Sequence, residues 1–458
     1  MHRFDAIIVG AGQAGPSLAA RLSTAGQSIA LIERHLFGGT CVNTGCTPTK
    51  ALVASAKVAE MARRAGDYGI GVSAPLRVDM ARVKARKDRI SGASREGVER
   101  WVRGLPGCTV LKGHARFETA HRMIVDDQPI EGERIFLNVG GRAMVPDLPG
   151  AGDVPYLTNT SILELETVPR HLVVVGGGYV GLEFAQMYRR FGAQVTVVER
   201  RPRLADHEDP DVSDCLREIL EAEGIAVRTA AECIRFRRQE EDVVVGLECT
   251  AGAPEVVASH VLLAMGRRPN TDDLGLDLAG VETDARGFIK VDDELRTSVS
   301  HIWAMGDCNG RGAFTHTSYN DFEIVAANLL DHDPRRVTDR ITAYALYIDP
   351  PLGRAGMTDE EVRRSGRRGL TGFRPMTHVA RAVEKGETQG FMKVTVDANS
   401  QQILGAAIIG PGADEAIHCV LDVMYARAPY QTLQRAVHIH PTVSELIPTI
   451  LGEMRPLV

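Results

Sequence analysis

The chain has 458 residues, enough for about three domains on the usual relation between length and domain number. Its 44% hydrophobic and 24% charged residues are ordinary for a soluble globular protein, and a formal net charge of -6 gives no support for a nucleic-acid partner. No apolar run reaches membrane-spanning length, and the sequence opens on an expected strand rather than a secretion signal. We therefore expect a cytoplasmic protein with no membrane partner.

The N-terminal segment has the pattern of a dinucleotide-binding fold. An apolar strand over residues 4–9 leads into a glycine turn, an amphipathic helix and a second strand that ends at Glu33. The glycines with GxGxxG spacing are Gly10, Gly12 and Gly15. In this fingerprint the helix N-terminus takes the pyrophosphate, and an acid placed like Glu33, 18 residues after Gly15, takes a ribose hydroxyl pair.

Two cysteines, Cys41 and Cys46, lie five residues apart after this fingerprint and before a helix expected over 51–64. A disulfide between them requires a bend over residues 42–45, which the Asn-Thr-Gly run supplies. A pair that must open and close needs such a turn, and a close pair in a reducing compartment favours catalysis. We therefore predict a redox-active disulfide. The remaining cysteines are scattered and are expected mainly in the core or in strands: Cys108, Cys215, Cys233, Cys249, Cys308 and Cys419.

A second fingerprint follows in matching register. A strand over 171–175, a glycine turn and a helix lead to a strand that ends at Glu199, 18 residues after the last glycine. The glycines are Gly176, Gly178 and Gly181. Two dinucleotide-binding folds in one chain imply electron transfer between two dinucleotides, most simply from a nicotinamide to a flavin.

The residues that end the second fingerprint bear on the choice of nicotinamide. Glu199 favours the free 2′-hydroxyl of NADH. Arg200, Arg201 and Arg203 come directly after it, where basic residues can hold the 2′-phosphate of NADPH or simply face solvent. We expect NADH to be slightly favoured, with NADPH still open.

The rest of the chain adds one further strand motif and a change of pattern. A strand over 261–265 and the Gly-Arg-Arg-Pro-Asn run after it are expected to close the second fold. A strand near 302 ends in Gly-Asp, where Asp307 could bond a flavin's ribityl chain or cap the next helix. Beyond about residue 340, strands over 343–348, 390–396 and 403–410 and a helix over 414–426 predict a separate α+β domain.

Residues 41–50, Cys-Val-Asn-Thr-Gly-Cys-Thr-Pro-Thr-Lys, resemble the active-site signature of the flavin-dependent pyridine nucleotide–disulfide oxidoreductases. That family includes lipoamide dehydrogenase, glutathione reductase and mercuric reductase, and the likeness covers essentially the whole chain. It implies an α/β fold with two Rossmann-like domains, for FAD and NAD(P), and a C-terminal α+β dimerisation domain. The implied limits are 1–150 with 271–338 for FAD, 151–270 for NAD(P), and 339–458 for dimerisation.

The resemblance also implies roles for individual residues. Cys46 would lie against the flavin and Cys41 would attack substrate, while Lys50 and Glu183 would pair near the flavin. Tyr179 would cover the nicotinamide pocket. The other cofactor contacts expected are Arg34, Gly39, Thr40, Gly140, Asp307, Thr315, Arg200 and Gly266, and no metal site is expected.

Near the C-terminus, a His-x-His-Pro-x-x-Ser-Glu run matches the family's acid–base pair. A lone histidine is more often a core residue, but His440 with Glu445 in this setting favours catalysis, since a carboxylate-held imidazole is an effective acid–base group near neutral pH. By resemblance His440 acts on Cys41 of the other subunit, so the active unit is a homodimer. His438 lacks that support and is expected to be structural.

Several features bear on the acceptor. The C-terminal Glu-Met-Arg-Pro-Leu-Val lacks the vicinal cysteines of mercuric reductases, which counts against efficient Hg(II) reduction, and Val42, Thr47 and Thr49 depart from the lipoamide dehydrogenase signature. Residues 314–325 and 350–358 are more similar to the reactive-chlorine-resistance flavoenzymes. That resemblance implies reduction of a small oxidant such as hypothiocyanous acid, a disulfide, or a metal ion such as Cu(II). The alternatives are a dihydrolipoamide dehydrogenase and, without catalysis, a metal-binding or scaffold flavoprotein.

Overall fold

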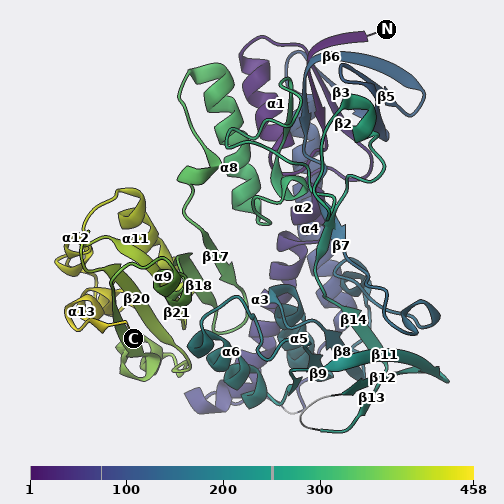
Figure 1. Ribbon diagram of the computed structural model, residues 1–458. Coiled ribbons are helices and arrows are strands. Elements are labelled where there is room, and N and C mark those ends of the chain that lie inside the picture. Colours follow the sequence, from purple (N-terminus) through teal and green to yellow (C-terminus); the bar gives the residue numbers. More distant parts are fainter. Residues whose placement is uncertain (1, 74, 249–251, 458) are drawn as a thin grey trace.

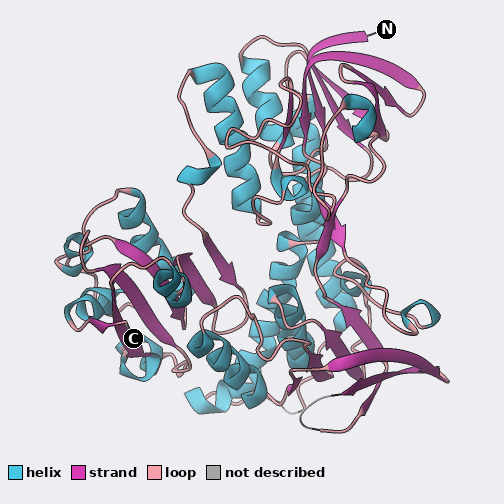
Figure 2. Cartoon of the chain, in the orientation of Figure 1, coloured by secondary structure: helices cyan, strands magenta, loops and turns pink. Residues whose placement is uncertain are grey.

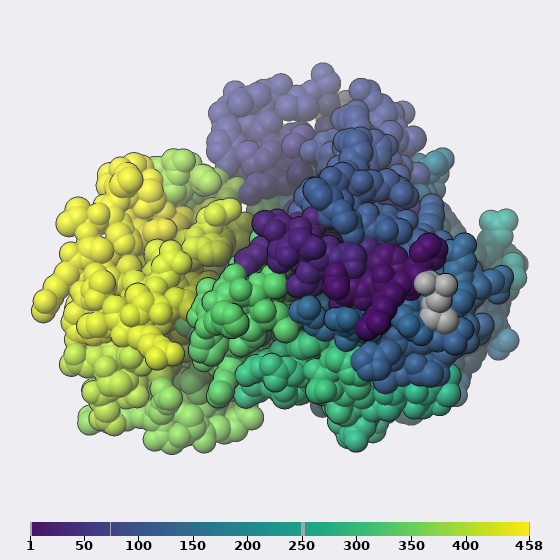
Figure 3. Space-filling model, turned by 90° about the horizontal axis from the view of Figure 1, so that it is seen from above, coloured from purple at the N-terminus to yellow at the C-terminus, as the bar shows by residue number. Residues whose placement is uncertain are grey.

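A computed structural model describes residues 2–73, 75–248 and 252–457 of the chain. The chain forms three sheet-based parts: a purple-to-blue N-terminal part, to which the later, green residues 302–326 return, a teal middle part and a yellow-green C-terminal part (Figure 1). Helices cover the sheets in each part (Figure 2). Seen from above, the C-terminal residues form one side of the molecule and the N-terminal residues the other (Figure 3). The expected α/β fold is therefore confirmed.

The N-terminal part is built on a seven-stranded sheet of order β3-β2-β1-β6-β5-β4, with β16 paired to β6. Its β1 is central, because both faces of the apolar run are buried: Ala6 and Ile8 face helices α1, α4 and α8, while Ile7 and Val9 face the other side. The strands are β1 (His2–Val9), β2 (Ile29–Glu33), β3 (Cys108–Lys112), β4 (Ala115–Thr119), β5 (Arg122–Val125), β6 (Gln128–Leu137) and β16 (Ile302–Ala304). The helices are α1 (Gly15–Thr24), α2 (Gly39–Asn43), α3 (Cys46–Arg63), α4 (Met80–Arg103), α7 (Leu276–Ala279) and α8 (Thr315–Ala326).

The middle part repeats the parallel pattern on a smaller scale, in the order β10-β9-β8-β14. One face of this sheet packs on α5 and α6, and the other packs on a three-stranded antiparallel sheet, β11-β12-β13. The elements are β8 (His171–Val175), α5 (Tyr179–Phe191), β9 (Gln194–Val198), α6 (Pro210–Ala222), β10 (Ala226–Arg228), β11 (Glu232–Gln239), β12 (Asp242–Glu248), β13 (Glu255–Ala258) and β14 (His260–Leu263). A two-stranded ribbon, β7 (Gly141–Ala143) with β15 (Arg267–Pro269), joins the segments that enter and leave this part.

The C-terminal part is an α+β unit around a six-stranded antiparallel sheet of order β17-β18-β21-β20-β19-β22. One face packs on α11 and α13, and the other carries Leu352, Phe391 and Ile409 into the core that includes α5 and α6. The elements are β17 (Ala343–Leu346), β18 (Leu352–Gly356), α9 (Asp359–Arg364), β19 (Gly369–Pro375), α10 (Ala380–Glu384), β20 (Phe391–Asp397), β21 (Ile403–Ile409), α11 (Ala413–Tyr425), α12 (Gln431–Gln434), α13 (Ile447–Gly452) and β22 (Arg455–Pro456).

The structure corrects one expected helix boundary. The helix expected over 51–64 begins at Cys46, so this cysteine lies in the first turn of α3. The neighbouring strands β3 and β4 lie at opposite ends of the strand order of their sheet. The expected domain limits at residues 150, 270 and 338 stay a prediction, and Cys249 lies outside the described residues.

Within residues 2–73, 75–248 and 252–457, no helix combines the length and apolarity that a bilayer crossing requires.

Candidate active site

A single cavity of about 1730 Å³ lies between the N-terminal and middle parts and brings most of the expected site residues together. Pockets for one small ligand usually measure about 300–1,000 Å³, so this cavity has room for more than one. Both glycine turns and both cysteines line it, with these expected residues: Gly10, Gly12, Glu33, Arg34, Gly39, Thr40, Cys41, Cys46, Lys50, Gly140, Gly176, Gly178, Tyr179, Glu183, Glu199, Arg200, Gly266, Asp307 and Thr315. The lining residues do not include Gly15, Gly181, His440 or Glu445.

The first glycine turn is shaped by close backbone contacts. A Cβ at Gly10 would lie 2.3 Å from the Asn138 carbonyl oxygen, and one at Gly15 would lie 2.2 Å from the Gly10 carbonyl oxygen. These glycines therefore let α1 begin directly against the ends of β1 and β6. Glu33 accepts hydrogen bonds from the backbone N–H groups of Ala11 (2.9 Å) and His35 (2.8 Å), so its carboxylate also orders the turn.

Sequence reasoning missed Asn138, a buried residue at the end of β6 that ties the turn to the adjoining strand. Its Oδ1 accepts from the Gly15 N–H at 3.1 Å, and its Nδ2 donates to the Met305 carbonyl at 3.0 Å. Its signal in the sequence is a single amide side chain at the end of an otherwise apolar strand. Asp321 on α8 was also missed, and it accepts from the Gly306 N–H at 2.7 Å.

The second glycine turn repeats this construction. A Cβ at Gly176 would lie 2.4 Å from the Ala264 carbonyl oxygen, and one at Gly181 would lie 2.1 Å from the Gly176 carbonyl oxygen. Glu199 accepts from the N–H groups of Gly177 (2.6 Å) and Arg201 (2.7 Å), as Glu33 does in the first turn. Glu33 and Glu199 therefore each accept a hydrogen bond from a backbone N–H group of their own glycine turn.

The bare backbone of the cavity wall fits a dinucleotide. At Gly178 and Gly140 a Cβ would meet no atom within 4 Å, so these glycines leave open space toward the cavity they line. Gly178 also precedes α5, whose first N–H groups have no partner within the helix and suit a pyrophosphate. The residues present therefore fit the cofactor groups expected of them.

The two cysteines lie on either side of a break between α2 and α3. Thr44 follows the last residue of α2, and Gly45, with φ -134° and ψ -120°, lies outside both the helical and the extended regions before Cys46 begins α3. A Cβ at Gly45 would lie 2.8 Å from the Thr40 carbonyl oxygen, which explains why glycine occupies the bend. Both cysteines are free thiols here, Cys41 half-buried and Cys46 exposed.

The two sulfurs have opposite acidities. A hydrogen bond from the Cys41 thiol, helped by Thr315 and Lys50, lowers the pKa of Cys46 to about 6. The same contact, with burial, raises the pKa of Cys41 far above its ordinary value. The Thr315 hydroxyl lies 3.2 Å from the Cys46 sulfur. At neutral pH the pair is therefore a thiolate at Cys46 and a thiol at Cys41.

Lys50 and Glu183 meet beside the thiolate. Lys50 lies one helical turn after Cys46, and its Nζ is 2.6 Å from a Glu183 carboxylate oxygen that is almost fully buried. The other Glu183 oxygen accepts from the Tyr347 N–H at 2.9 Å, and the Lys50 ammonium lies 4.6 Å from the Tyr347 ring centre. Glu183 follows Tyr179 by one turn of α5, so both face the same cavity.

Asp307 lies in a 3₁₀ turn, Gly306–Asn309, after β16 and lines the cavity. The capping alternative is wrong, because Met305 is the residue before that turn and Phe314 is the residue before α8. Burial raises the pKa of the Asp307 carboxyl, and Arg267, 3.5 Å away, acts in the opposite direction.

His440 and Glu445 pair at the far end of the chain. The imidazole Nδ1 lies 2.9 Å from a Glu445 oxygen, and the His440 side chain is 73% exposed. Its neighbours Val437 and Ile439 are 98% and 79% exposed. His438 instead bonds the Ser444 carbonyl at 2.8 Å, which fits a structural role. The His440–Glu445 pair is therefore not part of the lining of its own subunit's cavity.

Two dinucleotide-type turns that open onto one dithiol define a pyridine nucleotide-dependent disulfide oxidoreductase. The chain belongs to that family: residues 4–321 match the pyridine nucleotide-disulphide oxidoreductase family, and residues 342–450 match its dimerisation domain. Members of this family are enzymes, so the alternative of a non-catalytic metal-binding or scaffold flavoprotein is rejected. Membership implies FAD and NAD(P)H as cofactors.

The chain is similar to several characterised members. It is 35% identical over 453 residues to the probable pyridine nucleotide-disulfide oxidoreductase RclA of Escherichia coli, covering 97% of this chain and 98% of that protein. It is 32% identical over 454 residues to a dihydrolipoyl dehydrogenase of Haloferax volcanii (97% and 94% covered) and 31% over 450 residues to a mercuric reductase of Streptomyces lividans (97% and 94%). The solved Cu(II) complex of the HOCl-induced flavoprotein disulfide reductase RclA superposes with a TM-score of 0.90 at 34% identity, covering 99% of this chain and 100% of that one.

Proposed function

We propose that this protein is an FAD-dependent NAD(P)H oxidoreductase that passes electrons through the Cys41–Cys46 disulfide to a small oxidant, a disulfide or a metal ion. The observation that carries the proposal is the placement of Cys41 and Cys46 on either side of the Gly45 bend, in a cavity lined by both glycine turns. When bound, FAD would accept a hydride from NAD(P)H and pass the electron pair to the disulfide.

The cofactor assignments rest on the two turns. Gly10, Gly12 and Gly140 would border the FAD pyrophosphate, with Asp307 near its ribityl chain, while Gly176 and Gly178 would border the NAD(P)H pyrophosphate. Lys50 is placed to counter negative charge beside Cys46, since its ammonium lowers the pKa of that thiol.

The high pKa of Cys41 indicates that attack on substrate needs a base, because a thiolate at Cys46 disfavours a second one nearby. His440 is held by Glu445 and exposed on its own subunit. The partner subunit's His440 would therefore take the proton from Cys41 in a homodimer.

The nicotinamide preference is proposed as NADH. Arg203 lies 3.2 Å from Asp214, and Arg201 lies 3.7 Å from Asp206, so an acid competes for the charge of each. Arg200 and Arg201 both line the cavity, and the described residues give Arg200 no ion pair. These two arginines leave NADPH as the second candidate.

The acceptor is proposed as hypothiocyanous acid or a Cu(II)- or Hg(II)-type ion. In support, a solved relative at 34% identity is described as HOCl-induced and binds Cu(II). Similarity to dihydrolipoyl dehydrogenases at 32% identity makes lipoamide the second candidate. For either acceptor, Cys41 is the sulfur that would meet substrate.

A consumption screen tests the proposal. Wild-type holoenzyme is given NADH or NADPH with hypothiocyanite, Cu(II), Hg(II), lipoamide or glutathione disulfide, beside the Cys41→Ser variant. We expect oxidant-dependent NADH consumption that the variant loses. Consumption that persists at the wild-type rate in Cys41→Ser with every acceptor would contradict a path through the disulfide.

A further inference from the structure

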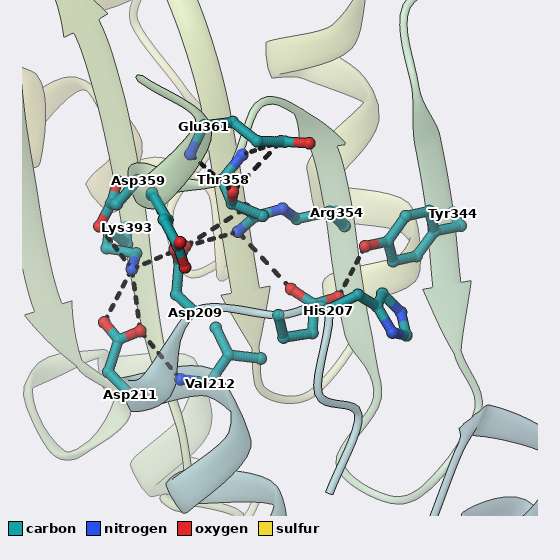
Figure 4. A network of polar contacts seen from close by, with 12 residues as sticks. His207, Asp209, Asp211, Val212, Tyr344, Arg354, Thr358, Asp359, Glu361 and Lys393 are labelled. Carbon is teal, nitrogen blue, oxygen red and sulfur yellow. Dashed lines mark hydrogen bonds and ion pairs between the residues drawn. The ribbon is translucent and has the colours of Figure 1, made fainter. Parts of the chain in front are cut away.

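A network of charged side chains crosses the interface between the middle and C-terminal parts (Figure 4). Residues 207–211, which lead into α6, meet strands β17, β18 and β20 of the C-terminal sheet there. Apolar side chains surround this contact, including Leu216 of α6 and Leu352 and Phe391 of the sheet. Charges buried in such a setting persist only when each is paired.

The buried cations of this network come from the dimerisation domain. The Arg354 guanidinium donates two bonds to one Asp209 oxygen, both at 3.2 Å, and lies 3.8 Å from Glu208. The Lys393 ammonium lies 3.2 Å from Asp209 and 2.8 Å from Asp211. The segment that carries Glu208 is therefore fastened to strands β18 and β20.

Glu208 links this anchored segment to the cavity. One of its oxygens accepts from the Tyr179 hydroxyl at 2.7 Å and from the Tyr344 hydroxyl at 2.7 Å. The Glu208 side chain is fully buried, and its second oxygen accepts no hydrogen bond from the described part of the chain. The two tyrosine rings are 5.3 Å apart.

Tyr179 is the residue of this network that lines the cavity. It is the first residue of α5 after the glycine turn, and it shares a helix face with Glu183, which pairs with Lys50 beside the thiolate. Burial and the Glu208 carboxylate raise the pKa of the Tyr179 hydroxyl, so it stays a hydrogen-bond donor. The Tyr179 side chain lines the cavity together with Gly178 and Glu183.

We propose that Glu208 is a positioning residue that holds the Tyr179 ring over the nicotinamide pocket, and that Arg354 and Tyr344 of the dimerisation domain fix Glu208 in place. The inference rests on the proposed function, because it needs a nicotinamide to bind there. For the Tyr179 side chain to swing away from the pocket, its hydrogen bond to the Glu208 carboxylate must break. Such a bond to a charged group is stronger than one between neutral groups. The apparent affinity for nucleotide is then reduced by the fraction of molecules in which the ring is closed.

The test compares two tyrosine substitutions on the same helix in the FAD-loaded dimer. Tyr179→Phe keeps the ring and removes the hydroxyl that contacts both Glu208 and His207. Tyr188→Phe is the control, because Tyr188 is a buried tyrosine on the same helix that donates to the Ile162 carbonyl at 2.8 Å. The oxidised enzyme is titrated with NAD⁺ and NADP⁺ by the change in flavin absorbance, and flavin reduction by NADH and NADPH is followed separately.

We expect Tyr179→Phe to lower the Kd for NAD⁺ and the KM for NADH by about tenfold, the effect expected from losing the charge-assisted hydrogen bond to Glu208. Tyr188→Phe should leave both constants unchanged. Glu208→Gln keeps an acceptor but loses the charge, so it should move Kd in the same direction by a smaller factor.

Unchanged or weakened NAD⁺ binding in Tyr179→Phe, or an equal change in Tyr188→Phe, would overturn the proposal. If NADH or NADPH still reduces the flavin of the wild-type enzyme in the same experiment, only the proposed role of Glu208 is rejected. If neither nucleotide reduces the wild-type flavin, the proposed function is rejected as well.

Discussion

The Thr315 hydroxyl is expected to set part of the acidity of Cys46. It lies 3.2 Å from the sulfur, and Thr315→Val removes it while keeping the side chain's shape. A hydrogen bond to a charged group contributes about 1.5 kcal/mol at the low end, the end suited to an exposed sulfur. Since one pKa unit corresponds to about 1.36 kcal/mol, the variant should raise the Cys46 pKa by about one unit, from about 6.

The sign and size of this effect can be read from alkylation rates. A lowered pKa means that the thiolate is present above pH about 6 and is lost as the pH falls through that value. At pH about 6.5 roughly three quarters of wild-type Cys46 should be thiolate, against roughly one quarter in Thr315→Val. The assay is the pH dependence of iodoacetamide labelling of Cys46 in the reduced holoenzyme, located by mass spectrometry.

Thr315→Ser is the control, because it keeps the hydroxyl and should keep the wild-type midpoint. A Thr315→Val midpoint within about a third of a unit of wild type would refute the reasoning, as would an equal shift in Thr315→Ser.

Three further outcomes follow from the site. Asn138→Ala should cost about 2 kcal/mol in urea unfolding and weaken FAD retention, because it leaves the buried Gly15 N–H without its acceptor and the Met305 carbonyl with only the Cys308 thiol; an unchanged midpoint would contradict this. Lys50→Met should lower the free energy of unfolding by about 2 kcal/mol, less than the loss of a fully buried ion pair, because the Lys50 side chain is a third exposed. The double variant with Glu183→Gln should recover part of that loss in the same assay, and no recovery would contradict the pairing. Heterodimers of Cys41→Ser with His440→Gln should retain about half of wild-type acceptor turnover if His440 acts across the interface, since one site keeps both groups; no turnover would place His440 within its own subunit.

The two dinucleotide turns were predictable because their signals are local. Each is a strand, a glycine spacing and an acid at a fixed offset, and each acid bonds the turn it follows. The cysteine bend was equally local, since Gly45 alone accommodates the close approach to Thr40. The strands Phe391–Asp397 and Ile403–Ile409 are buried on both faces, which suits their largely apolar sequences.

What the sequence did not reveal depends on contacts between distant segments. Asn138 bonds Gly15 and Met305, 123 and 167 residues away, so no spacing marks it. Strand β19 has glycines and a terminal proline, which weaken its strand pattern. Glu208 is an ordinary acid before a helix, and only the packing of the C-terminal sheet buries it.

The central claim is that electrons reach the acceptor through a thiolate at Cys46. It is tested most directly by anaerobic titration of the holoenzyme with NADH and NADPH, beside Cys46→Ser. The account predicts that wild type develops a long-wavelength absorbance from the Cys46 thiolate against the flavin, and that Cys46→Ser lacks it. Wild-type reduction that yields only reduced flavin, with no such absorbance, would contradict the account.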